Sequence, residues 1–288
     1  MYFLLIPLFI FNIAFAQAPR MGINNVVDIL SRPQQALNPL PPSTCPMIYI
    51  DKDIHRGGCP ELKKNPSTWN NEIMFSCFQY LRSVITNGKN KDSLNRDQVL
   101  SKLYQLEPHE QELMGMVLTS YGEVRGSDIN ESFLVMQTLL NRAKTAQKRG
   151  CKLANALDTA TQNLQFSVWN RKDPNWKKAV SLEEEEYDEE KKMRALLNVY
   201  KRFKNNDFKI APQDKATFEK ITHFRTKKIP KVPEWGGANR AIKTIRLNGK
   251  DAGSTGNMKV LHYFFKDTPW SFRYNINRPQ RQGEEACY

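Results

Sequence analysis

Apolar residues recur along the middle of the chain with the spacing of one face of an α-helix. Two helices are predicted on this pattern, one beginning near Pro108 and one from about 130 to 148, because apolar side chains three and four residues apart share a face. The apolar positions of the two helices are Leu113, Met116, Val117, Tyr121, Phe133, Met136, Leu140 and Ala143. Gly150 follows the second helix and suits its C-terminus. We expect these helices to form the core of a mainly α-helical domain.

Weaker patterns surround this pair of helices. A shorter helix is predicted at 153–163, and an amphipathic helix at 67–86 follows a Pro-rich stretch. Residues 216–288 alternate short apolar runs with Gly and Pro, which indicates loops with a short hairpin or strands. The expected organisation is an N-terminal extension at 17–97, Pro-rich and then helical, followed by a main domain at 98–288.

A charged segment interrupts the predicted main domain at about 170–215. It contains the acidic run 183–190 and then a basic helical stretch that ends at about Lys204. Blocks of like charge on a helix usually form a solvated face. We therefore expect the acidic run to form a solvated helix face, within a charged insertion in the main domain.

The first sixteen residues have the pattern of a secretory signal. Residues 1–15 are apolar almost without a break, and Ala14 and Ala16 are small residues at the positions that a signal peptidase inspects. The run is shorter than the roughly 20 apolar residues that span a bilayer. We predict a signal peptide at 1–16 and export to the periplasm, the extracellular space or the cell wall. No stable membrane insertion is expected after cleavage.

The charge of the chain narrows the class of partner. The chain has 288 residues with 43 Lys+Arg against 30 Asp+Glu, a formal net charge of +13, and its 40% hydrophobic content excludes wholesale disorder. Residues 191–288 hold 22 of the basic residues and 8 of the acidic ones. Such a field attracts nucleic acid, an anionic membrane or anionic envelope polymers. Because no zinc finger or aromatic RNA-binding signature accompanies it, nucleic acid is not expected.

The chain has five cysteines, which are Cys45, Cys59, Cys77, Cys151 and Cys287. In an exported protein an even number of them would form disulfides, which leaves at least one free or paired with another molecule. Cys45 and Cys59 are close together in a Pro/Gly-rich stretch, and we predict a disulfide between them. Because no C-x-x-C and no His/Cys cluster has the spacing of zinc ligands, neither a metal nor another cofactor is expected.

The segment Tyr121–Gly126, with the sequence YGEVRG, carries the most chemistry. It places the carboxyl group of Glu123 at the end of an apolar helix, between two glycines that would let a ligand approach the backbone. Burial raises the pKa of a carboxyl group, and a carboxyl that stays protonated near neutral pH can act as a general acid. The alternative is a structural carboxylate that pairs with Arg125 or Arg142.

Four further elements follow YGEVRG in a fixed order: Asn141-Arg142, Gln165-Phe166-Ser167, Pro233-Glu234-Trp235 and His262-Tyr263-Phe264. Over about 106–266 the chain thereby resembles the SleB-type cell wall hydrolases, a family that includes spore cortex-lytic enzymes and is related in fold to lysozyme-like lytic transglycosylases. The resemblance implies an α+β lysozyme-like fold of mainly α class, with a helical catalytic domain and a small β-hairpin or loop region. The chain departs from the family at Ser127, at 170–215 and at 17–97.

The resemblance implies that Glu123 is the catalytic acid. The residues expected to bind substrate are Gln165, Ser167, Asn141, Trp169, His223, Trp235 and Tyr263. Aromatic rings among them suit the flat C–H faces of a sugar, although each one could equally belong to the core. A hydrogen-bonding or structural role is expected for His223 and His262 rather than metal binding, because no third ligand is indicated.

The implied reaction is cleavage of the bond between N-acetylmuramic acid and N-acetylglucosamine in peptidoglycan glycan strands. Lytic transglycosylases do this with one carboxyl group, which acts first as acid and then as base and leaves a 1,6-anhydro end. A muramidase-type hydrolase is the first alternative, with Asp128 or Glu131 positioning a water molecule. The others are an amidase, which commonly needs zinc, and a noncatalytic envelope-binding protein. The expected partners are glycan strands and anionic envelope polymers.

Overall fold

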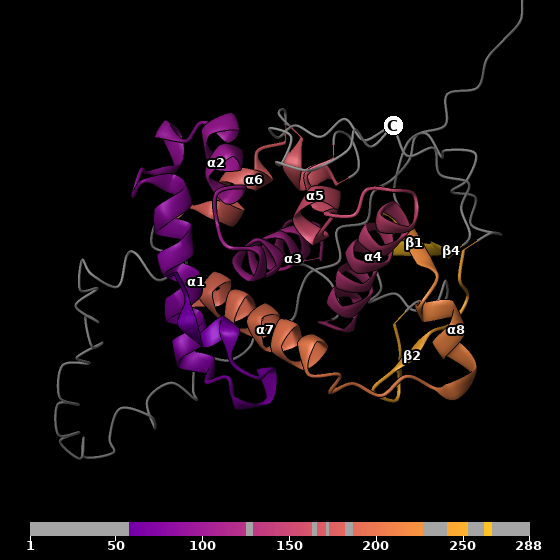
Figure 1. Cartoon of the computed structure of the whole chain (residues 1–288). Coiled ribbons are helices and arrows are strands. Elements are labelled where there is room, and N and C mark those ends of the chain that lie inside the picture. Colours follow the sequence, from indigo (N-terminus) through magenta and orange to yellow (C-terminus); the bar gives the residue numbers. More distant parts are fainter. Residues whose placement is uncertain are drawn as a thin grey trace, which may run out of the picture. The chain divides into compact units, whose positions relative to one another are not determined.

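The structure is a computed structural model that describes residues 58–124, 129–162, 166–170, 173–181, 187–226, 241–252 and 262–266. These residues all belong to one compact unit, 52–288. They form mainly α-helices with four short strands (Figure 1), which confirms the predicted mainly α-helical class. The predicted signal peptide lies outside the described residues. No helix among the residues described is both long enough and apolar enough to cross a membrane.

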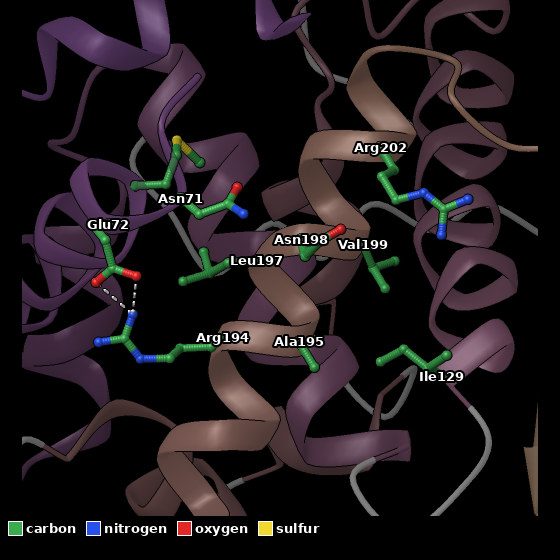
Figure 2. A pocket seen from close by; sticks show the side chains of 10 residues that line it. Asn71, Glu72, Ile129, Arg194, Ala195, Leu197, Asn198, Val199 and Arg202 are labelled. Atoms are coloured by element: carbon green, nitrogen blue, oxygen red, sulfur yellow. Dashed lines mark hydrogen bonds and ion pairs between the residues drawn. The ribbon is translucent and has the colours of Figure 1, made fainter. Parts of the chain in front are cut away.

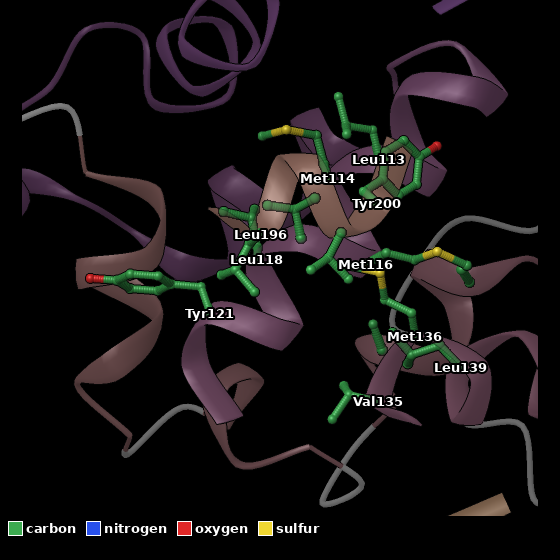
Figure 3. Close-up of a cluster of buried hydrophobic side chains, with 14 of the residues drawn as sticks. Leu113, Met114, Met116, Leu118, Tyr121, Val135, Met136, Leu139, Leu196 and Tyr200 are labelled. Carbon is green, nitrogen blue, oxygen red and sulfur yellow. The ribbon is translucent and has the colours of Figure 1, made fainter. Parts of the chain in front are cut away.

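Helices α3 (Pro108–Val124) and α4 (Ile129–Lys148) lie at the centre of the fold, as their apolar spacing predicts. α3 packs against α4, α5 (Ala156–Ala160) and α7 (Tyr187–Lys204). α5 is shorter than its predicted range, because a capping box between Asn155 and Asp158 sets its start. Figure 3 shows the core between these helices, where the buried side chains include Leu113, Met116, Leu118, Val135, Met136, Leu139, Leu196 and Tyr200.

The charged segment at about 170–215 contributes a helix to the core, and this helix ends at Lys204 as predicted. α7 packs against α1 (Asn71–Thr86), α3 and α4. Its buried residues are Met193, Leu196, Leu197, Val199, Tyr200 and Phe203. These residues occupy one face of an amphipathic helix, and the charged residues between them cover the opposite face. The acidic residues 183–186 lie outside the described residues.

The helices before α3 share this core. Asn70 caps α1 and Asn95 caps α2 (Arg96–Leu103), and each side chain accepts two backbone N–H groups. α2 runs across the predicted domain boundary between 97 and 98. The part of the predicted N-terminal extension from Cys59 onward therefore packs as part of the helical domain. Three 3₁₀ helices complete this region: η4 (Pro60–Lys63), η5 (Pro66–Thr68) and η6 (Lys91–Ser93).

A disulfide joins Cys59 to Cys77, so the predicted pairing of Cys59 with Cys45 is wrong. Cys59 immediately precedes η4, which packs against α1. The Cα atoms of Cys59 and Cys77 are 5.8 Å apart, well within the reach of a disulfide. Proximity in the sequence was misleading because the fold brings η4 back onto α1. Cys151 is also disulfide-bonded.

Two small antiparallel pairs of strands follow the helices. β1 (Ile221–Thr226) pairs with β4 (His262–Lys266), with Phe224 opposite Phe264. β2 (Arg246–Leu247) and β3 (Lys250–Asp251) form the predicted short hairpin. Its turn residues Asn248 and Gly249 have φ angles of 51° and 76°, the left-handed conformations that an Asn-Gly turn favours. The remaining short helices are η7 (Ser167–Trp169), α6 (Asn175–Val180), η8 (Pro212–Asp214) and α8 (Lys215–Phe218).

Candidate active site

The last turn of α3 lies directly against η7 because Gly122 has no side chain. A Cβ atom built on Gly122 would lie 2.1 Å from Cγ2 of Val168 and 2.4 Å from its Cβ. The space beside the first glycine of YGEVRG is therefore filled by Val168, which is fully buried. Gly122 serves helix–helix contact here, not the ligand approach that the sequence suggested. The second glycine, Gly126, lies outside the described residues.

The close approach of η7 brings two hydrogen-bond donors to the carboxyl group of Glu123. The Ser167 hydroxyl donates to Oε1 at 2.9 Å, and the backbone N–H of Val168 donates to the same atom at 3.1 Å. Both hydrogen bonds involve one oxygen, and no donor among the described residues contacts Oε2. The carboxyl group is thus held at Oε1.

The surroundings of Glu123 raise its pKa. The largest cause is burial, which penalises the charged form, and the nearby Asp173 carboxylate acts in the same direction. The bonds from Val168 and Ser167 and the charge of His262 act in the opposite direction. The side chain is half-buried, so the carboxyl is crowded by protein atoms while part of it still reaches solvent. Such a group can retain its proton at a higher pH than an ordinary glutamate.

Two hydrogen bonds of Trp169 fix η7 in place. The Trp169 indole N–H donates to the Thr119 hydroxyl at 2.8 Å, and Arg96 Nε donates to the Trp169 carbonyl at 2.6 Å. Trp169 is 1% exposed. Its ring is consequently part of the core and is not offered to a sugar. The residue still matters to the site, because it positions the neighbouring Ser167 and Val168.

A buried carboxylate and an imidazole lie at the junction of α4 and β4. Glu131 is fully buried, and its Oε1 accepts the His262 backbone N–H at 3.0 Å. Nδ1 of His262 lies 3.7 Å from the same oxygen. Neither Glu131 Oε2 nor His262 Nδ1 has a hydrogen-bond partner among the described residues. Glu131 is therefore unsuited to hold the exposed water molecule that the hydrolase alternative assigned to it.

Asn141 and Arg142 support the wall behind the site. The Asn141 amide donates to the carbonyls of Phe218 and Ile221 at 3.1 and 2.8 Å, and its oxygen accepts from Gln137. These bonds tie the start of β1 to α4. Because Asn141 is 5% exposed, its polar atoms serve the fold and not a ligand.

Arg142 links the wall to the aromatic residues of η7 and β1. Its guanidinium group lies over the Phe166 ring, 5.4 Å from the centroid, and donates to Gln162. It also helps to lower the pKa of His223 to about 3, although burial of the imidazole is the larger cause. His223 is therefore a neutral, buried residue, and its Nδ1 is 3.0 Å from the Thr222 hydroxyl.

The predicted site residues fall into three groups. Ser167 contacts Glu123, so the structure brings the YGEVRG and Gln165–Ser167 elements together. Trp169, Asn141 and His223 are buried, whereas Tyr263 is half-buried with the Arg225 guanidinium 4.8 Å from its ring centroid. Gln165 and Trp235 lie outside the described residues, as do Arg125 and Asp128.

The sequence did not reveal three residues that contact or influence the site around Glu123: Val168, Thr119 and Asp173. Val168 acts through its backbone N–H, which no side-chain pattern reveals. Thr119 gives no sign in the sequence beyond being a hydroxyl residue on the apolar face of a helix. Asp173 belongs to the segment treated as an insertion, and its proximity to Glu123 becomes visible only once η7 and α6 are placed.

Two pockets of the described surface lie away from Glu123. One of about 410 Å³ lies beside α7, where Arg194 forms an ion pair with Glu72 at 2.9 Å (Figure 2). Another of about 650 Å³ is lined by Phe203, Phe208 and Lys204, among others. Neither is lined by Glu123. Among the residues described, no group of three His, Cys, Asp or Glu side chains could hold a metal ion.

No protein-family model matches the chain, and no curated protein or solved structure matches it significantly.

Proposed function

We propose that the protein is an exported enzyme that cleaves the bond between N-acetylmuramic acid and N-acetylglucosamine in peptidoglycan, as a lytic transglycosylase. The observation that carries this proposal is the carboxyl group of Glu123. It is half-buried with a raised pKa, and among the described residues its donors, Ser167 and Val168, both bind Oε1. A general acid needs this combination of a retained proton and a fixed orientation.

The hydrogen bonds decide which oxygen would carry the proton. Oε1 accepts from Ser167 and Val168, so the proton of the neutral acid resides on Oε2. Oε2 would protonate the glycosidic oxygen as the bond to C1 breaks. The carboxylate then takes the proton from the C6 hydroxyl of the muramoyl residue, whose oxygen closes on C1 to form the 1,6-anhydro end. The bonds to Oε1 favour the carboxylate after proton donation and do not have to be rebuilt during the reaction.

The likeness to SleB-type hydrolases and to a lysozyme-like fold is part of this proposal. Its support is the contact of Ser167 with Glu123, together with the electrostatic effect of His262 on the same carboxyl. Three of the elements that carry the resemblance thus converge on one group. Export and docking on anionic envelope polymers are proposed on the signal-like N-terminus and on the basic C-terminal third of the chain.

A muramidase-type hydrolase is the second candidate, and Asp173 favours it. A glycoside hydrolase uses a second carboxylate as base or nucleophile. Asp173 is half-buried and close enough to raise the pKa of Glu123. Its Oδ1 accepts the Asn175 backbone N–H at 2.8 Å, which fixes the carboxylate in place.

Digestion of purified peptidoglycan sacculi tests the proposal. Mass spectrometry of the soluble products should find 1,6-anhydro ends, and Glu123→Gln should lower the rate by at least about 100-fold, the low end of general-acid contributions. Glu107→Gln, an exposed glutamate at the other end of α3, is the matched control and should retain the wild-type rate. Reducing ends that depend on Asp173 would replace the lyase by the hydrolase. Absence of any glycan fragment would refute both.

Measuring the stability of Glu123→Gln shows whether a loss of activity in this variant comes from the missing acid or from misfolding. A carboxyl group whose pKa is raised in the folded state stabilises the protein fully only below its unfolded pKa, and this contribution is lost as the pH rises through the folded pKa. Glutamine has no such titration. We therefore expect Glu123→Gln to be at least as stable as the wild type at neutral pH, as measured by thermal unfolding.

A further inference from the structure

The pair formed by Glu131 and His262 is not used by the chemistry proposed above. A fully buried carboxylate with one unbonded oxygen destabilises a protein unless something compensates for it. His262 is 5% exposed, and its Nδ1 also lacks a hydrogen-bond partner in the part of the chain that the structure describes. Two buried polar groups with unmet hydrogen bonds at one junction call for an explanation other than stability.

Contacts connect this pair to Glu123 along two routes. One is electrostatic, since a charge on the His262 imidazole favours the carboxylate form of Glu123. The other is a series of packed rings: His262 meets Phe224 edge-on at 5.3 Å, and Phe224 lies 5.5 Å from Phe166. Phe166 precedes Ser167, which donates to Glu123. A displacement of His262 therefore acts on the donor that orients the catalytic carboxyl.

We propose that Glu131 and His262 are positioning residues: Glu131 fastens β4 to α4, and His262 presents a charge to the Glu123 carboxyl. This inference rests on the proposed function, because it explains how one carboxyl group serves in turn as acid and as base. Burial alone favours the neutral acid. A nearby imidazolium favours the carboxylate that remains after the proton has been given.

The charged groups around the two partners are few among the residues described. Glu123 faces His262 of β4 and Asp173, which lies before α6. His262 faces Glu131 of α4. Because Asp173 and His262 act on the Glu123 pKa in opposite directions, removing His262 leaves the bonds from Val168 and Ser167 to oppose burial and Asp173.

Carbon-13 NMR of the full chain with labelled glutamate and histidine tests the pair without relying on activity. The Glu123 side-chain carboxyl signal is assigned from its loss in Glu123→Gln, and the His262 ring signal from its loss in His262→Gln. In His262→Gln and His262→Phe the Glu123 titration should move to higher pH, because both variants lack the charge and phenylalanine retains a ring against Phe224. The alkaline limb of the pH–rate profile should move in the same direction.

His109→Gln is the matched control for histidine removal. His109 lies near the start of α3, 14 residues and hence about 21 Å along the helix from Glu123. Its removal should leave the Glu123 titration unchanged. An unchanged Glu123 titration in both His262 variants would overturn the charge role.

Two variants of Glu131 test its positioning role. Glu131→Gln retains an oxygen that can accept the His262 N–H, whereas Glu131→Ala does not. Hydrogen exchange of the His262 amide should be near the wild-type rate in the former and at least tenfold faster in the latter. Glu110 of α3 is another buried carboxylate that accepts backbone N–H groups. The control variant Glu110→Gln should leave the exchange rate of the His262 amide unchanged. Equal exchange in Glu131→Ala and the wild type would overturn the positioning role.

The wild-type chain provides a measurement that survives a misfolded variant. Hydrogen exchange of the His262 amide in the wild type should be clearly slower than that of an unprotected amide, because the buried Glu131 carboxylate accepts this N–H. An unprotected His262 amide would overturn the inference. This result differs from a failure of the proposed function, which would show as intact sacculi whatever the exchange rate is.

Discussion

Replacement of Gly122 by alanine tests the contact on which the site depends. The new Cβ would lie 2.1 Å from Val168 Cγ2 and 2.4 Å from Val168 Cβ, far inside van der Waals contact. Alanine in a helix gains up to about 1 kcal/mol over glycine, and overpacking of a rigid core costs about 1–3 kcal/mol. Val168 is fully buried and Trp169 holds η7 in place. The backbone of η7 therefore cannot easily move away to remove the clash. We expect a net loss of roughly 1–2 kcal/mol.

Urea unfolding of the oxidised protein measures this loss as a lower midpoint at unchanged slope. The midpoint temperature of thermal unfolding should fall by roughly 2–8 °C, given about 2–4 °C per kcal/mol for a chain of this size. Gly115→Ala is the graded comparison, because its Cβ would lie 2.9 Å from the Leu157 Cα and its clash is smaller. It should cost less and leave the Glu123 titration unchanged.

A double-mutant cycle identifies the cause. Val168→Ala retains the Cβ atom that lies 2.4 Å away, so only Val168→Gly removes the whole clash. By itself Val168→Gly should cost about 1.5–3 kcal/mol in lost burial. Combined with Gly122→Ala it should cost clearly less than the sum, because the new methyl group occupies part of the vacated space. Additive costs within about 0.5 kcal/mol, or a Gly122→Ala variant as stable as the wild type, would refute the reasoning.

Two further predictions follow from other contacts. Ser167→Ala removes a donor that lowers the pKa of Glu123, so the carboxyl titration by NMR should move to higher pH and the alkaline limb of activity with it; an unchanged or lower midpoint would contradict the role of the hydroxyl. The Cys59→Ser/Cys77→Ser pair opens a bridge across a sequence separation of 18, which should cost about 3 kcal/mol and lower the thermal midpoint on the order of 10 °C. Identical melting of the wild type and this pair would show that the bridge contributes nothing.

The helical core was predictable where apolar spacing is strong. α3 and α4 appear at their expected positions because their apolar faces are continuous over several turns. α7 was not recognised as a core helix, because its buried positions such as Met193 and Tyr200 are interleaved with charged residues. Composition averages over both faces of a helix, whereas burial depends on one face alone.

The site was predictable in part. Glu123 was singled out by its place at the end of an apolar helix, and the structure places the Ser167 hydroxyl within hydrogen-bond distance of it. That the two residues line a substrate cleft stays a prediction. The aromatic character of Trp169 suggested a sugar platform, but its indole N–H has a partner inside the protein, Thr119. The side-chain type alone does not tell whether its polar atom faces a ligand or the core. The backbone donor at Val168 leaves no trace in a pattern of side chains.

The fit of α3 to η7 has an evolutionary consequence. Thr119, Gly122 and Glu123 lie within little more than one turn, and each contacts a residue of η7. A change in the size of Val168 would have to be matched at Gly122, even in a descendant that had lost Glu123 and the activity proposed for it. We therefore expect Gly122 to be conserved in more diverged homologues of this chain than Glu123. The glycine would then indicate common descent, whereas the glutamate would indicate that the proposed chemistry is retained.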